Sequence, residues 1–470
     1  MTMNSMMLRF NEIYKRLDTG NQAGISTIRQ TISPEMADEM TFAENLYYNR
    51  TNNIPWLKSG EVKSLHIPSV LCREIANVVC SEADISIAGE NDRAAYMNEI
   101  AKRVTRELPI YTEKALATGN LIFKPYVSNN RIYIKACEIG DFIPLRFNDS
   151  GELDSVAFVT TINRNSKWYV RVEYHHKENG VYTVENTAYT SSERTSGLGG
   201  AVDLSTVPEW ANIAPIATIE GEDVPMLFGF YRCPNANTVD RDSFLGLSVY
   251  SSCFDLFKEC DELWEATTYE MKSGERKIFA TPGAFAKIRD KYKMFRFYKE
   301  LNLDGDMMRE FSPAFRNANY SYRLQEIFKR IEENCGLAYG TISDPQTIER
   351  TATEVKHSKE RMQATVNAIQ TEMQYALEQM FRAIDIVCDV YGITTPGDYE
   401  PIFVWDDSVI ESRQEKADRA LMEYQNGLID KADYFVQTRG MSRDEAETYI
   451  SEMQTPPQVG ADWFAGTQGT

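Results

Sequence analysis

The chain has 470 residues, too many for one ordinary hydrophobic core, so about two to four folding units are expected. With 43% hydrophobic and 25% charged residues, the composition is that of a globular protein and excludes a largely disordered chain. A formal net charge of −19 argues against a monomer that wraps nucleic acid, because that mode of binding requires a net basic footprint.

Residues 1 to about 118 are expected to be mainly helical, since apolar residues recur there at helical spacing, most clearly over residues 69–79. From residue 121 to residue 189 the apolar period shifts towards two, in runs rich in Val, Ile, Tyr and Phe. Asn129-Asn130 and Asn179-Gly180 mark turns between these runs. The pattern predicts an antiparallel β-rich unit with strands at residues 121–127, 132–139, 156–162, 168–174 and 181–187.

Two features of the β-rich part could suggest chemistry. The run 195–200 (TSGLGG) lacks the spacing and the Lys-Ser/Thr pair of a phosphate-binding loop, so we interpret it as a flexible insertion. His175 and His176 would face opposite sides of a strand, and we interpret them as surface residues and not as a metal pair. No GxSxG or similar motif is present, and the eight cysteines lack zinc-site spacing. The sequence therefore predicts no catalytic residue, no metal and no cofactor.

Long helices dominate the second half of the chain. An apolar stripe that includes Phe257, Cys260 and Trp264 predicts a helix over residues 247–271. Further helices are expected at residues 320–335 and 353–391, followed by a C-terminal helical unit at residues 408–453. The helix 353–391 would span roughly 58 Å, about twice the ~30 Å width of a small domain, so it must cross several layers or pack against copies of itself. No run of about 18 apolar residues exists, so no membrane span is expected.

A basic segment separates the first two of these helices. Residues 272–299 contain nine Lys or Arg residues against two acidic ones, Glu275 and Asp290. Strands are expected at residues 277–280 and in the alternating run 292–298, with a turn between them. The segment is therefore predicted to form a small, positively charged module.

Three groups of segments, taken in order, carry a resemblance to a known family. The first is residues 228–237 (FGFYRCPNAN) with 243–250 (SFLGLSVY) at the start of a helix. The second is residues 310–316 (EFSPAFR), then 331–337 (IEENCGL) and Gly340-Thr341. The third is residues 351–355 (TATEV) opening the long helix, with 403–408 (FVWDDS) after it. In order and spacing these segments resemble portal proteins of long-tailed bacteriophages of Gram-positive hosts, over about residues 45–455.

The resemblance implies an α+β, portal-type fold with a wing, stem helices, a small α/β clip, a long spine helix and a helical crown. The wing would comprise residues 1–240, with a helical N-terminal part followed by the β-rich part. The stem helices would be 241–272 and 318–335, on either side of the clip at 273–317. A tunnel loop would follow at 336–352, then the long helix and a return to the wing at 353–405, and the crown with the C-terminal tail at 406–470.

The resemblance also implies a function. Portal subunits form a ring, typically of about twelve copies, at one capsid vertex. Double-stranded DNA passes through the channel of this ring, without sequence specificity, during packaging and ejection. The implied partners are the terminase large subunit, the scaffolding and major capsid proteins and a head-completion adaptor, with no membrane partner. The implied protein is not an enzyme, and it would reside in the virion after assembly in the bacterial host cytoplasm.

Two segments are candidate sites under this interpretation. The tunnel loop would contact DNA transiently, whereas the alternative is an ordinary connection between helices; its candidate residues are Gly336, Tyr339, Gly340, Thr341, Ser343, Asp344, Gln346, Thr347 and Arg350. The basic segment, which belongs to the clip, would be a docking surface for acidic partner proteins. Its candidate residues are Lys287, Arg289, Lys291, Lys293, Arg296 and Lys299. Its alternatives are a positive collar where DNA enters, or a solvated strand face whose lysines discourage edge pairing.

Two further questions stay open at the level of sequence. The apolar stripes of the helices 247–271 and 353–391 could form core within one subunit, or could be buried in part only between neighbours in a ring. The protein as a whole could instead be another phage head structural protein, or a hydrolase assembled from Asp and Glu pairs in the β-rich half.

Overall fold

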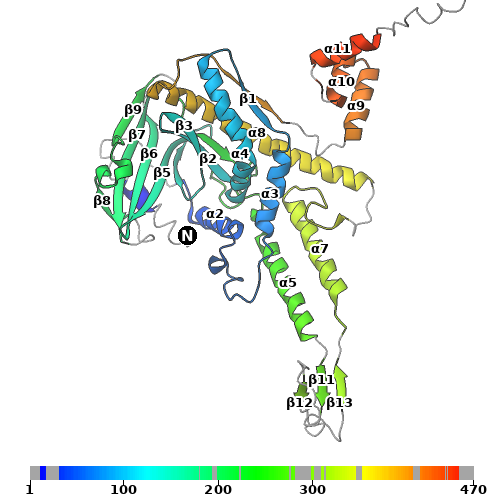
Figure 1. Ribbon diagram of the computed structural model, residues 1–470. Helices are drawn as coiled ribbons and strands as arrows, with labels where there is room; N and C mark the ends of the chain where they lie inside the picture. The colour runs from blue at the N-terminus through cyan, green and yellow to red at the C-terminus, as the bar shows by residue number, and fades with distance from the viewer. Residues whose placement is uncertain are drawn as a thin grey trace, which may run out of the picture. The chain divides into compact units, whose positions relative to one another are not determined.

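The computed structural model describes residues 11–16, 31–178, 180–192, 198–221, 224–274, 277–280, 298–300, 308–311, 314–345, 352–405, 413–439, 441 and 443–454. The chain divides into two compact units, residues 1–405 and residues 406–470. Helices and strands both contribute extensively to the first unit, as Figure 1 shows, and the expected α+β class is confirmed.

Helices dominate the described residues before residue 119, as predicted. The elements are α2 (Pro34–Tyr47), the 3-10 helix η1 (Thr51–Asn53), α3 (Ile67–Val79), β1 (Asp84–Ala88) and α4 (Asp92–Thr118). Asn91 caps α4, because its side chain accepts a hydrogen bond from the backbone N–H of Ala94. The apolar residues of α3 that recur at helical spacing are buried, including Leu71, Ile75 and Val79. The strand β1 is the one element here that the helical pattern does not predict.

Two antiparallel sheets follow α4. The smaller sheet has the order β10-β2-β3 and consists of β2 (Asn120–Ser128), β3 (Arg131–Cys137) and β10 (Gly229–Arg232). The larger has the order β4-β5-β6-β7-β8 with β9 also paired to β7, and consists of β4 (Phe142–Phe147), β5 (Leu153–Arg164), β6 (Lys167–Glu178), β7 (Val181–Ser191), β8 (Gly200–Val202) and β9 (Ile216–Glu220). The short helices η2 (Leu204–Thr206) and η3 (Pro208–Trp210) lie between β8 and β9.

The five predicted strands correspond to β2, β3, β5, β6 and β7, whereas β4 is an additional strand. Its sequence does not alternate, since residues 142–145 are all buried. Pro144 also interrupts the pattern, and the register with β5 shifts between Pro144 and Arg146, as in a β-bulge. An apolar run with an internal proline carries no strand periodicity, which explains why the sequence pattern misses β4.

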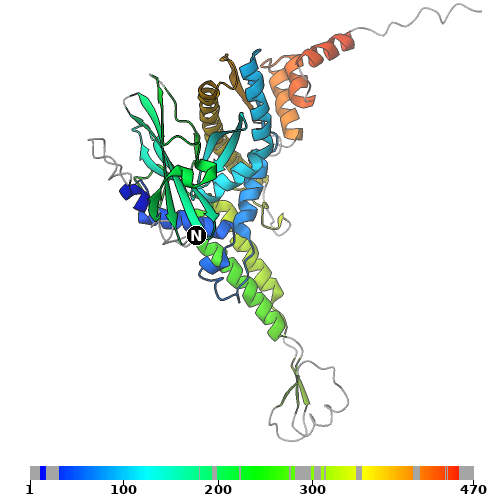
Figure 2. The ribbon, with the colours of Figure 1, turned by 60° about the vertical axis from the view of Figure 1, so that its left-hand side comes forward.

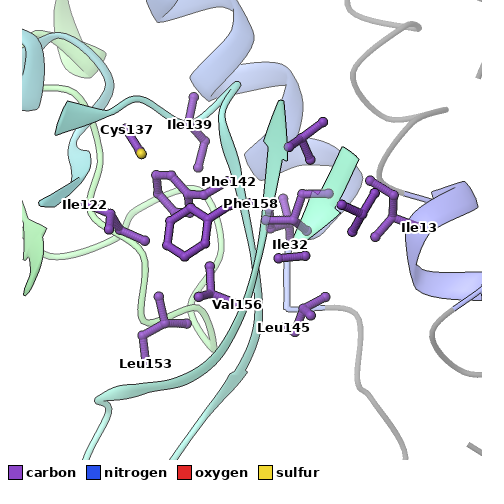
Figure 3. Packing of buried hydrophobic residues seen from close by; sticks show 14 of the residues in the cluster. Ile13, Ile32, Ile122, Cys137, Ile139, Phe142, Leu145, Leu153, Val156 and Phe158 are labelled. Carbon is purple, nitrogen blue, oxygen red and sulfur yellow. The ribbon is translucent and has the colours of Figure 1, made fainter. Parts of the chain in front are cut away.

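One large core cluster of the first unit lies against the larger sheet, as the close view in Figure 3 shows. Phe142 and Phe158 pack there beside Ile122 of the smaller sheet. Ile13, from the helical residues 11–16, is fully buried in the same cluster. The hydroxyl of Tyr14 donates a hydrogen bond of 2.8 Å to the carbonyl oxygen of Pro144. An N-terminal segment thus completes the core of a sheet that begins more than a hundred residues later.

The prediction that both histidines are surface residues is wrong for His175, which is only 3% exposed. Its Nδ1 lies 2.6 Å from the hydroxyl of Tyr182 and its Nε2 lies 2.8 Å from Glu173. Lys124 also pairs with Glu173, at 2.5 Å. Burial lowers the pKa of His175 despite the neighbouring carboxylate, so the ring is neutral at pH 7. These partners come from other strands or from the same face of β6, and they make an inward-facing histidine tolerable.

The prediction that the glycine-rich run 195–200 is a flexible insertion is wrong for residues 198–200, which the structure describes. Residues 195–197 lie outside the described residues. Leu198 is fully buried, and its backbone N–H donates a hydrogen bond of 2.6 Å to the carboxylate of Glu12. Gly200 begins β8, which pairs with β7. The end of the run is thus fixed by contacts with a distant helix, and the sequence pattern does not show them.

Three long helices complete the first unit. They are α5 (Phe254–Ser273), preceded by η4 (Ser251–Cys253), then α7 (Asn317–Asn334) and α8 (Ala352–Tyr391). α5 begins later than predicted because the backbone before it is engaged elsewhere: the N–H of Gly246 donates to the side chain of Asn120, and that of Val249 to the carbonyl of Leu116. The long helix expected at 353–391 is confirmed. α5 and α7 lie side by side in both Figure 1 and Figure 2.

Two small sheets involve the segments around these helices. β14 (Glu400–Val404) follows α8 and pairs antiparallel with β1, with Val404 opposite Asp84. β11 (Lys277–Ala280) pairs parallel with β12 (Tyr298–Glu300) and antiparallel with β13 (Met308–Phe311). The predicted strand at 277–280 is present, whereas residues 292–297 of the second predicted strand lie outside the described residues.

The second unit is helical, as predicted for residues 408–453, within its described part. It contains α9 (Arg413–Gln425), α10 (Lys431–Arg439) and α11 (Arg443–Gln454). Ala432, Phe435 and Ala446 form its small core. Arg443 pairs with Asp430 at 2.8 Å, which ties the start of α11 to the turn before α10. Across the described residues of both units, no helix is long and apolar enough to cross a membrane.

Candidate functional site

The connection from α7 to α8 starts with a helix end that Gly336 defines. The N–H of Leu337 donates to the carbonyl of Glu332 at 2.7 Å, and the N–H of Gly336 donates to that of Glu333 at 3.3 Å, a Schellman motif. Gly336 has a φ of +70°, a conformation that glycine adopts without steric cost. A Cβ at this position would lie 2.3 Å from Oγ1 of Thr365 in α8. The direction of the connection is thus set by one glycine and its contact with α8.

Gly336→Ala is expected to destabilise the protein by about 2 kcal/mol, since the left-handed conformation costs an alanine roughly 1 kcal/mol and the contact with Thr365 adds to this. The matched control is Gly392→Ala, because Gly392 has a φ of +59° and a Cβ added there would have no described atom within 4 Å. Denaturant unfolding midpoints measure both changes. Equal losses in the two variants would contradict the role given to Thr365.

The carboxylate of Glu332 organises the next residues. This side chain is fully buried, at 0% exposure. Its Oε1 accepts hydrogen bonds from the backbone N–H groups of Ile342 at 2.7 Å and Ser343 at 2.8 Å. The N–H of Gly340 lies 3.1 Å from the same oxygen, and the hydroxyl of Ser343 donates to Oε2 at 2.9 Å. A carboxylate in the last turn of α7 therefore holds the backbone of the connection.

Side chains of α8 hold the first part of the same connection. Arg361 donates a hydrogen bond of 2.8 Å to the carbonyl of Leu337, and its guanidinium lies 5.0 Å from the centre of the Tyr339 ring. The N–H of Tyr339 donates to Oγ of the buried Ser358 at 2.7 Å. Residues 336–343 are therefore fixed between two helices by polar contacts.

The helix pair α5 and α7 leaves large apolar side chains uncovered. Phe257 and Cys260, in the first half of α5, are buried as the predicted stripe requires. Further along α5, Trp264 is 45% exposed and Met271 is 58% exposed, although both belong to that stripe. On α7, Tyr322 is 69% exposed. The stripe of α5 thus forms core within the subunit only in its first half.

Ion pairs join α5 and α7 along the same stretch. Arg323 of α7 pairs with Glu259 of α5 at 2.6 Å, and Arg316 pairs with Glu270 at 2.9 Å. The arginine and glutamate side chains of the first pair are largely exposed to solvent, so it contributes little to stability. These pairs join the two helices at two points along their length, and neither pair involves Trp264 or Tyr322.

A comparison with known families identifies the chain. A family model described as "Phage portal protein, SPP1 Gp6-like" matches residues 37–449, which is most of the sequence. The chain belongs to this family of phage portal proteins. It is therefore a portal connector subunit, a structural component of a phage-like virion and not an enzyme, and the alternatives of a hydrolase or of another head protein are set aside.

Two solved structures are similar to the portal subunit at low sequence identity. One is a chain in "Virion of native gene transfer agent (GTA) particle", with 10% identity and a TM-score of 0.41, covering 92% of this chain and 99% of that one. The other is a chain in "Neck of native GTA particle computed with C12 symmetry", with 9% identity and a TM-score of 0.42, covering 90% of this chain and 97% of that one. No curated protein matches the sequence.

The predicted tunnel-loop residues fall into two groups in this portal subunit. The first group lies in the connection held by Glu332 and α8, and consists of Gly336, Tyr339, Gly340, Thr341, Ser343 and Asp344. Gln346, Thr347 and Arg350 lie outside the described residues. The backbone N–H of Asp344 donates to Gln325 of α7 at 2.7 Å, so the contacts with α7 continue to that position. Contact of this loop with DNA stays a prediction.

One of the predicted docking residues of the clip, Lys299, lies among the described residues. Lys287, Arg289, Lys291, Lys293 and Arg296 lie outside the described residues. The backbone of Lys299 belongs to β12, opposite Phe279 of β11. The docking role, the positive collar and the solvated strand face therefore stay open as interpretations of this segment.

Sequence reasoning missed three residues that hold the portal loop: Glu332, Ser358 and Arg361. Glu332 carried one usable signal. It lies in the last turn of a predicted helix, where a negative charge is unfavourable next to the helix C-terminus and requires a compensating partner. Ser358 and Arg361 carried no local signal. A polar residue of a helix that binds a loop cannot be distinguished in the sequence from one that faces solvent.

Proposed function

We propose that the portal subunit forms a closed ring of about twelve copies at one capsid vertex, with a central channel through which double-stranded DNA passes during packaging and ejection. The observation that carries the ring is the uncovered apolar surface of α5 and α7. Trp264, Met271 and Tyr322 are each about half exposed or more in the single subunit. Large apolar side chains that stay exposed on two adjacent helices point to a surface for association with another protein chain.

A second copy of the chain is the occupant that fits this surface. In a cyclic ring each subunit presents two different surfaces to its neighbours, so one flank of the α5 and α7 pair would meet the opposite flank of the next pair. Aromatic side chains are favoured at the centre of such interfaces because each one buries a large apolar area. This arrangement explains why the apolar stripe continues along α5 after its cover within the subunit ends.

The negative net charge of the chain favours a channel through which DNA slides over a site that binds DNA tightly. At −19 per subunit, a ring repels a polyanion from most of its surface. Screening limits this repulsion to about 8 Å at physiological ionic strength, so it acts near the channel wall. We propose that the tunnel loop at residues 336–352 lines the channel and touches DNA transiently and without sequence specificity.

The remaining partners follow from the proposed place of the ring in the particle. Assembly would begin in the host cytoplasm with the scaffolding and major capsid proteins. The terminase large subunit would then dock during DNA packaging, and a head-completion adaptor would replace it. The basic segment at residues 272–299 is the proposed docking surface, because its excess of Lys and Arg residues complements acidic partners.

The proposed ring is tested by placing charges on the uncovered apolar surface of α5 and α7. The double variant Trp264→Glu and Tyr322→Glu is expected to give folded subunits that no longer close into rings, because two charges would have to be buried between neighbours. Native mass spectrometry and negative-stain images measure this loss. The control is Ile216→Glu, at a 62% exposed position on β9. A monomeric parent protein, or rings that persist in the double variant, would overturn the proposal.

A further inference from the structure

We propose that Glu332 is the positioning residue of the tunnel loop: its carboxylate fixes the conformation of residues 340–343 and makes this part of the loop follow the end of α7. The anchoring itself is independent of what passes through the channel. Its consequence for DNA rests on the function proposed above.

The first argument is the environment of the carboxylate. Glu332 is completely buried, and its two oxygens accept hydrogen bonds from Gly340, Ile342 and Ser343 of the loop. Among the described residues, no Lys, Arg or His side chain forms an ion pair with it. A buried charge without a counter-ion is costly unless hydrogen-bond donors surround it. The loop N–H groups supply that stabilisation, so the charge and the loop conformation depend on each other.

The second argument is what the loop would lose without the carboxylate. Within the loop, the N–H of Thr341 reaches the carbonyl of Ala338 at 3.3 Å, and the N–H of Gly340 lies 3.1 Å from Oγ of Ser343. These contacts leave the N–H groups of Ile342 and Ser343 dependent on Glu332. Donors that lose their acceptor must find water, and the buried Ser343 would have to become exposed to do so.

The third argument is mechanical. Glu332 lies in the last turn of α7, and Asp344 is bound through its N–H to Gln325 two turns earlier in the same helix. The loop backbone is therefore attached to α7 at two levels. A displacement of the C-terminal end of α7 would carry residues 340–344 with it. The position of this loop in the channel would then be set by the stem helix and not by the loop's own sequence.

The test compares Glu332→Gln with the adjacent Glu333→Gln in assembled full-length protein. Glu333 is a matched control because its side chain is 42% exposed and pairs with Arg330. A glutamine at position 332 is neutral and keeps only one acceptor oxygen, so its NH2 group would face the N–H of Gly340 and the hydroxyl of Ser343. The amides of residues 340–343 are therefore expected to exchange hydrogen at least about tenfold faster, with α5 unchanged. Glu333→Gln is expected to leave them unchanged. Unchanged exchange in Glu332→Gln would overturn the positioning role.

A milder variant keeps the test usable if Glu332→Gln does not assemble. Ser343→Ala removes the hydroxyl bond to Oε2 together with the contact of that hydroxyl with the N–H of Gly340, and it leaves the carboxylate in place. It should raise the same exchange rates several-fold, whereas no effect there would count against the proposal. The DNA consequence is measured separately, as genome packaged per particle. Faster loop exchange with at least about tenfold less packaged DNA supports the whole proposal, whereas normal packaging overturns its DNA part and leaves the anchoring intact. Loss of the ring, seen by native mass, would instead concern the proposed function.

Discussion

Arg93→Met is expected to destabilise the subunit by about 3 kcal/mol, at the lower end of the range for breaking a buried ion pair. The Arg93 side chain is fully buried. Its guanidinium binds Asp385, Asp389 at 2.5 Å and the hydroxyl of Thr394 at 2.7 Å. Both carboxylates are partly exposed and are solvated when the arginine is removed, which is why the larger values of the range are not expected.

The control for Arg93 is Arg382→Met, which removes an exposed arginine from α8 and should change stability by less than about 0.5 kcal/mol. Unfolding midpoints in denaturant give the global effect. Amide exchange should rise locally at the first turn of α4 and the last turn of α8, because Arg93 joins these two helix ends. Similar midpoints for the two variants would show that the cluster does not stabilise the fold.

Gly229→Ala should cost at least about 2 kcal/mol, as overpacking does where the neighbours are backbone atoms and cannot move aside. A Cβ on Gly229 would lie 1.9 Å from the carbonyl oxygen of Ala376 and 3.0 Å from the backbone nitrogen of Met380. β10 would have to separate from α8 to make room. Gly140→Ala is the matched control, since no described atom lies within 4 Å of a Cβ added at that position. If both variants unfold at the same denaturant concentration, close contact of β10 with α8 is not required.

Helical and strand periodicity predicted most of the local structure. α8 was predicted to within a residue or two because its apolar positions repeat at threes and fours, and the helix is buried along one stripe. Buried and partly exposed residues alternate over residues 170–174 of β6 because one face of the sheet is core, whereas residues 155–159 of β5 are all buried. Local patterns fail where an element owes its form to distant partners. β14 is a strand because it pairs with β1, and nothing in the residues 400–404 shows that partner.

The candidate site divides in the same way. Gly336 and Gly340 favour a loop between the two predicted helices, because glycine acts locally on the backbone. The sequence does not predict the partners of Glu332 and Arg93, since an acidic residue near a helix end and a basic one in a first turn are common on solvated surfaces. What distinguishes them is burial beside groups that the fold brings together, and this depends on tertiary structure.

The pairing of β1 with β14 has a consequence for how the protein is made. β1 leaves the ribosome early, whereas its partner strand emerges only after α5, α7 and the whole of α8 have been synthesised. Until then the backbone groups of β1 that face β14 have no partner, and the contacts with α8 do not exist. The first unit therefore cannot complete its folding until the ribosome has synthesised residues 400–404. Recruitment of neighbours into a growing oligomer would have to wait for completed polypeptides.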